Sequence, residues 1–104
     1  MAFNVQLTAS AQSDIEETMD FLSERTPAHA SRWFEGLFEA METLREMPAR
    51  QGLIAEAGRL KRPLRVLPYA AHRVIYEVDD AQQIVFIVRI YHSSRAPLQA
   101  EDVI

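Results

Sequence analysis

The sequence contains no cysteine and only three glycines, and both shortages exclude classes of chemistry. Without cysteine there are no disulfides and no thiolate nucleophiles or metal ligands, so the fold depends on packing alone. The glycines are isolated along the chain, which excludes a glycine-rich phosphate-binding loop. No apolar run approaches the roughly 18–20 residues of a membrane span, and the N-terminal residues lack the basic and apolar regions of a signal peptide. We therefore expect a cytoplasmic protein.

The three histidines do not form a metal-ligand pattern. His29, His72 and His92 are widely separated, and no H-x-x-x-H pair is present. Two serines follow His92, but neighbours on a strand point to opposite faces, so His92 and Ser93 should diverge rather than act as base and nucleophile. The sequence predicts neither a metal site nor a cofactor.

The charge of the chain is unevenly distributed. The 104 residues have the composition of an ordinary globular domain with a single core, and the net charge is −4. Residues 1–44 hold 2 basic and 8 acidic side chains, whereas residues 45–95 hold 9 basic and 5 acidic ones. Either the basic half meets an anionic partner, or the two halves face each other through ion pairs.

The first half of the sequence predicts a short strand and two helices. Residues 3–8 alternate between apolar and polar, as in a half-buried strand. Residues 10–25 have an apolar stripe at helical spacing, and Thr26-Pro27 marks the start of a second helix. This helix is predicted over 27–47, and the two helices should pack as an antiparallel hairpin because few residues join them.

The second half predicts a loop, three strands and a short tail. Residues 48–63 hold two prolines, two glycines and four cations, which indicates a basic connecting loop. The remaining elements are strands over 64–68, 72–79 and 84–92 and a tail over 93–104. The order favours an α+β fold, in which an antiparallel-rich four-stranded sheet carries the helical hairpin on one face. Residues 1–104 should form one domain.

The last two predicted strands form a hairpin across a five-residue turn, 79–83. A register that pairs Val78 with Ile84 creates one apolar face, which should lie under the helices. This face consists of Val74, Tyr76, Val78, Ile84, Phe86 and Val88. The other face then places Arg73 directly opposite Arg89. Facing arginines repel each other, so either an anion lies between them or Glu77 and solvent compensate the charge.

Five segments carry a family resemblance through their order and spacing. They are Ala11-x-x-Asp14-Ile15 with Phe21, Met47-Pro48-Ala49-Arg50, Leu64-Arg65-Val66-Leu67-Pro68, Arg73-Val74-Ile75-Tyr76-Glu77-Val78 and Ile87-Val88-Arg89-Ile90-Tyr91-His92-Ser93-Ser94-Arg95. Together they resemble toxins of the ParE/RelE superfamily, the toxin half of type II toxin–antitoxin (plasmid stabilisation) modules. The resemblance implies the fold derived above and an antitoxin whose C-terminal segment wraps across the toxin.

The superfamily has two branches, and the resemblance favours one. RelE-like toxins are endoribonucleases that cut mRNA on the ribosome, and here the corresponding catalytic candidates are Arg65, Arg73, Arg89 and His92. However, Leu64 and Val66 stand where RelE proteins place catalytic lysines, and no aromatic residue or histidine follows Arg95. The chain looks more like the ParE branch, which inhibits DNA gyrase and is not known as a nuclease.

The resemblance also implies a contact surface for the partners. The predicted residues that bind antitoxin or target are Arg65, Arg73, Arg89, Tyr91, His92 and Arg95. An acidic, partly disordered antitoxin segment should fold onto these arginines. The expected partners are this antitoxin and DNA gyrase, or the ribosome and mRNA in the alternative, with no membrane.

Overall fold

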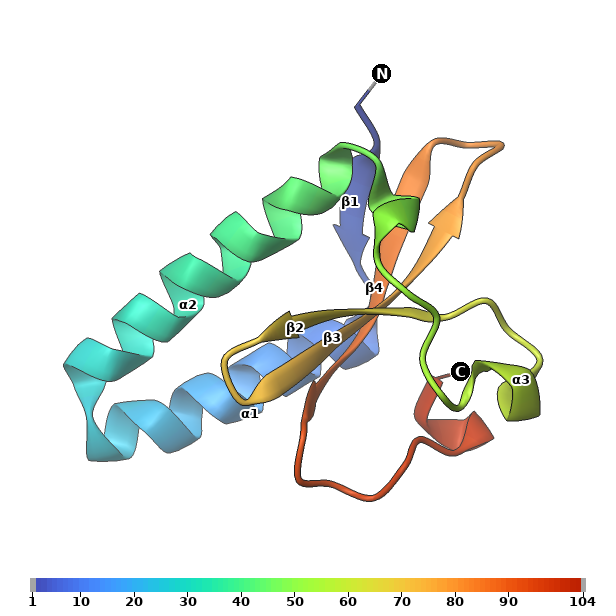
Figure 1. Ribbon diagram of the computed structural model, residues 1–104. Coiled ribbons are helices and arrows are strands. Elements are labelled where there is room, and N and C mark those ends of the chain that lie inside the picture. Colours follow the sequence, from blue (N-terminus) through green and yellow to red (C-terminus); the bar gives the residue numbers. More distant parts are fainter. Residues whose placement is uncertain (1, 104) are drawn as a thin grey trace.

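The computed structural model describes residues 2–103 and confirms the α+β fold (Figure 1). Strand β1 (Asn4–Leu7) precedes two long helices, α1 (Ala9–Arg25) and α2 (Pro27–Glu42). A short helix, α3 (Ala57–Leu60), interrupts the predicted loop. The chain then forms β2 (Arg65–Tyr69), β3 (His72–Asp79) and β4 (Ile84–His92). Three 3-10 turns complete the structure, at Thr43–Arg45, Pro48–Arg50 and Ala100–Val103.

The four strands form one mixed sheet with the order β1-β4-β3-β2. β1 is parallel to β4, and the other two pairs are antiparallel. Figure 1 shows α1 and α2 on one side of this sheet, with α3 and the C-terminal segment on the other. The predicted helical hairpin on one face is therefore confirmed. None of the helices within residues 2–103 is long and apolar enough to cross a membrane.

Side-chain hydrogen bonds explain where α1 begins and where α2 ends. The Thr8 hydroxyl accepts a hydrogen bond from the Ala11 amide and donates one to the Val88 carbonyl, so one side chain caps α1 and ties it to β4. α2 ends at Glu42, before the predicted end at residue 47. The Arg50 guanidinium closes this end, because it donates to the exposed carbonyl oxygens of Thr43 and Glu46 at 3.0 and 2.7 Å.

The predicted register of the β3–β4 hairpin is wrong by one residue. Asp79 pairs with Ile84, so the turn has four residues rather than five, and the Asp79 carboxylate closes it by accepting from the Gln82 amide. Because successive side chains on a strand alternate, this shift moves each β4 side chain to the opposite face of the sheet. Tyr76 therefore lies opposite Ile87, and not opposite Phe86 as predicted.

A β-bulge changes the register again in the middle of β4. Val88 is the additional residue, because Tyr76 pairs with Ile87 while Ile75 pairs with Arg89. Beyond the bulge Arg73 lies opposite Tyr91. The predicted pair of facing arginines is therefore absent from the sheet.

The sheet separates two hydrophobic cores. Under the helices lie Ala11, Ile15, Trp33, Leu37, Met41, Leu44, Val74, Tyr76, Val85, Ile87 and Ile90. On the opposite face lie Ile54, Ala57, Leu64, Ile75, Val88, Tyr91, Leu98 and Val103. Val88 thus belongs to the second core, and Ile84 and Phe86 are only half-buried, in contrast to the predicted apolar face. Both faces of the sheet are covered.

Candidate functional site

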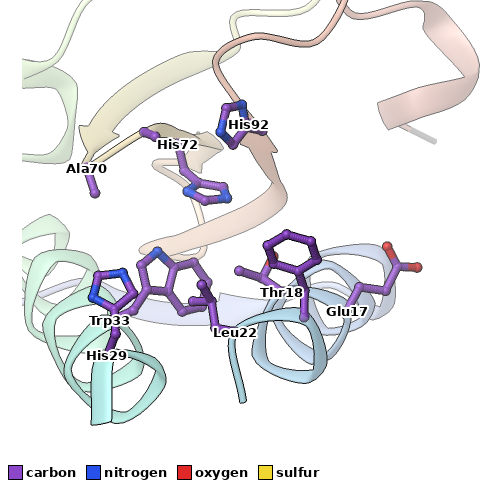
Figure 2. A pocket seen from close by; sticks show the side chains of 10 residues that line it. Glu17, Thr18, Leu22, His29, Trp33, Ala70, His72 and His92 are labelled. Atoms are coloured by element: carbon purple, nitrogen blue, oxygen red, sulfur yellow. The ribbon is translucent and has the colours of Figure 1, made fainter. Parts of the chain in front are cut away.

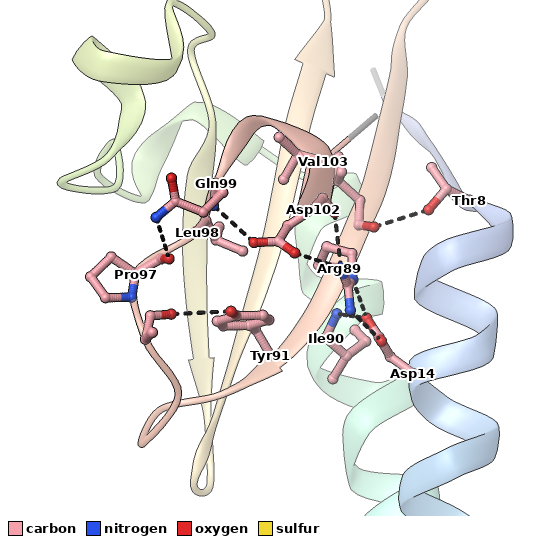
Figure 3. Close-up of polar contacts among 12 residues, drawn as sticks. Thr8, Asp14, Arg89, Ile90, Tyr91, Pro97, Leu98, Gln99, Asp102 and Val103 are labelled. Carbon is pink, nitrogen blue, oxygen red and sulfur yellow. Dashed lines mark hydrogen bonds and ion pairs between the residues drawn. The ribbon is translucent and has the colours of Figure 1, made fainter.

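The first candidate residue, Arg89, is bound to a buried carboxylate of α1. Its Nε and Nη2 atoms donate to the two carboxylate oxygens of Asp14 at 2.7 and 2.8 Å, which is the strong bidentate geometry. The Ile90 amide donates to the same carboxylate at 2.9 Å, and Arg89 Nη1 reaches the Asp102 carbonyl (Figure 3). Asp14 is only 8% exposed. The hydrogen bonds to Asp14 raise the pKa of Arg89, against the opposing effect of burial.

Arg73 has a similar carboxylate partner on the segment that precedes α3. Its two terminal nitrogens donate to the oxygens of Glu56 at 3.2 and 3.1 Å. The buried Leu98 amide also donates to Glu56, at 3.1 Å. The hydrogen bonds from Arg73, and secondarily from the Leu98 amide, hold the pKa of Glu56 at about 2 although burial acts in the other direction.

Other arginines hold the C-terminal segment against the sheet. Arg62 binds Glu77 on β3 with two hydrogen bonds of 3.3 and 3.2 Å and also donates to the Val103 carbonyl. Arg59 donates to the Leu98 carbonyl. The Tyr91 hydroxyl donates to the Ala96 carbonyl at 3.1 Å. The segment that the sequence predicts as a tail therefore closes the second core.

The remaining predicted site residues are spread over different surroundings. Arg65 donates to the Gln51 carbonyl at 2.6 Å, at the edge of the sheet. Arg95 is exposed, and its guanidinium lies 4.5 Å from the centre of the Tyr91 ring. His92 lies on the helix side of the sheet, away from the arginines. The predicted residues therefore do not form one continuous cationic surface.

His92 instead lines a pocket at the end of the helical hairpin. The pocket has a volume of about 390 Å³ and lies between α1, α2 and the turn that joins β2 to β3 (Figure 2). Its lining residues are Glu17, Thr18, Phe21, Leu22, His29, Trp33, Ala70, Ala71, His72 and His92. All three histidines of the chain thus contribute to one pocket, although they are far apart in the sequence. Within residues 2–103 no group of three histidine or carboxylate side chains could hold a metal ion.

Aromatic contacts organise the inner wall of this pocket. The ring centre of His72 lies 5.3 Å from that of Trp33 and 5.1 Å from that of His92, both edge to face. Trp33 Nε1 and His72 Nδ1 are buried and have no hydrogen-bond partner among residues 2–103. Burial lowers the pKa of His72, and the neighbouring His92 lowers it further.

Ser94 fixes the proton of His92. Both its amide, at 3.1 Å, and its hydroxyl, at 2.7 Å, contact His92 Nδ1. An amide is only a donor, so Nδ1 is an acceptor and a neutral His92 carries its proton on Nε2. The contacts with Ser94 thus hold His92 Nδ1 within a local turn. The His92 residue as a whole is exposed to solvent.

Sequence reasoning missed the partners of the candidate residues. Asp14 and Glu56 were not identified as site residues, nor were Trp33 and His72. Asp14 gave one signal: it follows Ala11 by three residues and precedes Ile15, so a carboxylate lies within the apolar stripe of a helix. Such a carboxylate needs a cation inside the fold. Glu56 gave no comparable signal because it belongs to an irregular segment.

Three of the arginines are neutralised by carboxylates of the same chain. The guanidinium forks of Arg62, Arg73 and Arg89 are directed at carboxylates of the same chain rather than at solvent. The pocket combines an apolar wall with Glu17 and with the buried, unpaired nitrogens of Trp33 and His72. The arginines thus form ion pairs within the fold, and the pocket lies apart from them at the end of the helical hairpin.

Comparisons with known proteins agree with this fold. Several solved structures resemble the chain, among them two from toxin–antitoxin systems. In the toxin–antitoxin complex RelBE2 from Mycobacterium tuberculosis, the similar chain has 22% identity and a TM-score of 0.58, over 88% of this chain and 99% of that one. In the chromosomal ParDE toxin–antitoxin system from P. aeruginosa, the values are 16% and 0.67, over 88% and 96%. No curated protein is significantly similar.

A family model provides the assignment. The model described as "ParE toxin of type II toxin-antitoxin system, parDE" matches residues 5–97, which include both long helices and all of β2 to β4. The match thus extends over most of the chain and confirms the resemblance that the sequence segments carry. The chain belongs to the ParE toxin family of type II toxin–antitoxin systems.

Proposed function

We propose that this protein is a ParE-like toxin that acts in the cytoplasm by inhibiting DNA gyrase and is neutralised by a cognate antitoxin. The family supports a toxin, and both similar structures are described as toxin–antitoxin systems or complexes, which supports an antitoxin partner. The inhibition of gyrase is the activity of the branch that the sequence resembles.

One observation favours an inhibitor over a ribonuclease. Cleavage of RNA needs cations that stabilise the charge on the phosphate, together with a base and an acid. Arg73 and Arg89, the two most plausible cations, already form bidentate pairs with Glu56 and Asp14. His92 lies on the other side of the sheet. These residues could act together on RNA only if the Arg73–Glu56 and Arg89–Asp14 ion pairs broke first.

The same observation bears on the predicted antitoxin contact. An acidic segment that binds Arg73 or Arg89 must displace a carboxylate of the toxin itself and the C-terminal segment as well. Arg65 and Arg95 have no carboxylate partner within residues 2–103. Arg65 is half-buried and donates to the Gln51 carbonyl, and the exposed Arg95 would make the small contribution that exposed charges make. The acidic segment at these arginines stays a prediction.

Purified protein tests the proposal directly. Inhibition of DNA supercoiling by gyrase at micromolar toxin, abolished by an equal amount of antitoxin, is the expected result. The matched control is the ribonuclease assay: transcript ends mapped in cells that express the toxin should show no cuts positioned by codon. Unchanged supercoiling together with codon-positioned cuts that disappear in Arg73→Ala would replace the gyrase inhibitor with an mRNA interferase.

A further inference from the structure

Two histidines meet where the strand ends contact the helical hairpin. His72 is the first residue of β3 and His92 the last of β4, and the two are paired in the sheet with their ring centres 5.1 Å apart. The ring centre of Trp33 on α2 lies 5.3 Å from that of His72. Figure 2 shows His72 between Trp33 and His92. His72 therefore connects the ends of two strands to the second helix.

The surroundings of His72 suit only its neutral form. A neutral imidazole carries a proton on one nitrogen, whereas an imidazolium carries one on both. His72 Nδ1 is buried and has no partner among residues 2–103. The other unpartnered buried atom of this cluster, Trp33 Nε1, is itself only a donor. Protonation of His72 thus places a charged N–H in the interior without an acceptor, which is costly.

His92 is also held in a neutral form. Its Nδ1 accepts the Ser94 amide at 3.1 Å. Protonation of His92 adds a hydrogen to Nδ1, and two N–H groups then face each other, so this bond is lost. In addition, a charge on either imidazole disfavours a charge on the other, because the two rings are in contact.

The charges around the two histidines do not reverse this preference. The titratable and charged groups near them are Asp14, Glu17 and Arg25 on α1, His29 on α2 and Tyr69 on β2. Asp14 favours protonation of His72, but both its oxygens already bind Arg89. Glu17 is exposed. Burial, followed by the neighbouring His92, therefore lowers the pKa of His72 below its ordinary value.

We propose that His72 and His92 form an acid-sensitive latch between the helical hairpin and the strand ends. The latch is closed while both rings are neutral. When they take up protons, His72 leaves its contact with Trp33, and the hairpin end separates from the turn that joins β2 to β3. Opening exposes the Trp33 indole, which is 5% exposed in the closed form, to water. The latch goes beyond the proposed function, and its test requires neither gyrase nor antitoxin.

The direction of the pH effect follows from proton binding. The pKa of His72 is lowered from 6.5 in the closed form, so the open form binds the proton at a higher pH. The stability of the closed form is therefore complete above about pH 6.5 and falls as the pH drops below it. Glu56 loses its contribution only below pH 4.5, so the two effects occupy separate pH ranges.

The fluorescence of the purified toxin provides the test, because Trp33 is the only tryptophan. Between pH 8 and pH 5 we expect the Trp33 emission to move to longer wavelength and the melting temperature to fall. The uptake should be roughly one proton per titrating histidine. Emission wavelength and melting temperature that stay constant over this range overturn the proposal. Loss of intensity without a change of wavelength also overturns it, because His72 is then protonated in place and the latch stays closed.

Two substitutions assign the transition to its residues. His72→Phe keeps an aromatic ring beside Trp33 but cannot take up a proton, so it should abolish the wavelength shift. His29→Gln removes an exposed histidine from the same pocket and should keep the wild-type profile. A shift that persists in His72→Phe, or one that disappears in His29→Gln, contradicts the latch.

His92→Gln keeps the proposal testable if His72→Phe does not fold. Without the neighbouring charge of His92, His72 takes up its proton more readily, so the midpoint of the wavelength shift should move to higher pH. An unchanged midpoint in His92→Gln would mean that the two histidines do not act together, and the latch would be wrong.

Discussion

The two faces of the sheet are closed by different means, although the same strands β3 and β4 line both. The inner face is covered by two regular helices, and its core is formed by large apolar side chains at helical and strand spacing. The outer face is covered by irregular segments, and arginine–carboxylate pairs and arginine–carbonyl bonds hold them there. A regular element brings its own hydrogen bonds, whereas an irregular one needs side chains to satisfy its backbone. The comparison explains why the basic residues of this acidic protein are concentrated in its second half.

Removing the carboxylate that joins the two faces should have the largest effect. Asp14→Ala leaves the Arg89 guanidinium with only the more distant Asp102 carboxylate, 3.9 Å away, and the Ile90 amide without its acceptor. Because a buried charge without a close, hydrogen-bonded carboxylate is costly, we expect a loss of about 3–5 kcal/mol in the free energy of unfolding. Urea unfolding followed by circular dichroism measures it. Asp20→Ala, an exposed aspartate on the same helix, is the control and should change stability by less than about 0.5 kcal/mol. Similar values for the two variants would contradict a structural role for Asp14.

A leucine of the C-terminal segment should have the next largest effect. Leu98 is fully buried in the outer core, so Leu98→Ala leaves a cavity and should cost about 2–4 kcal/mol. Leu53 is 55% exposed, and Leu53→Ala is the matched control, with an expected cost below about 1 kcal/mol. Equal unfolding midpoints for the two variants would mean that the segment is not part of the cooperative fold.

Acid should weaken the outer face through Glu56, with a smaller effect. Its pKa is about 2 in the folded protein and 4.5 in the unfolded chain. A depressed folded-state pKa contributes stability that is complete above pH 4.5 and is lost as the pH falls toward 2, in total about 3 kcal/mol. Glu56→Gln should therefore be less stable than wild type at pH 7, and the difference should shrink below pH 4.5. Glu24→Gln, an exposed glutamate, should follow the wild-type pH profile. A constant difference between Glu56→Gln and wild type from pH 7 to 2.5 would contradict this linkage.

The sequence predicts the helices and the order of the elements well, and the facing of the β4 side chains and the outer face poorly, for physical reasons. The helices follow from apolar spacing and from Thr26-Pro27, and the strands follow from their β-branched residues, so element order and fold class are predictable. The hairpin register depends on one residue in the turn and on a bulge at Val88, and neither has a strong local signal. The C-terminal segment has no periodicity, because it is held by residues that are distant in sequence, such as Arg62 and Glu56.

The candidate site shows the same division. Individual cations are visible in the sequence. What each cation binds is a tertiary property: the Arg89–Asp14 pair joins residues 75 positions apart. The histidine pocket was not predicted because His29, His72 and His92 meet only when the hairpin of helices packs on the strand ends.

The central claim is that the arginines of the outer face stabilise the fold through carboxylates of the same chain. A double-mutant cycle on Arg89 and Asp14 tests it most directly, with Arg89→Ala, Asp14→Ala and the double variant unfolded in urea at pH 7. We expect a coupling energy of about 2 kcal/mol or more, with the double variant no less stable than either single one. Additive losses, with a coupling energy below about 0.5 kcal/mol, would contradict the claim and make Arg89 a cation available to an anionic partner.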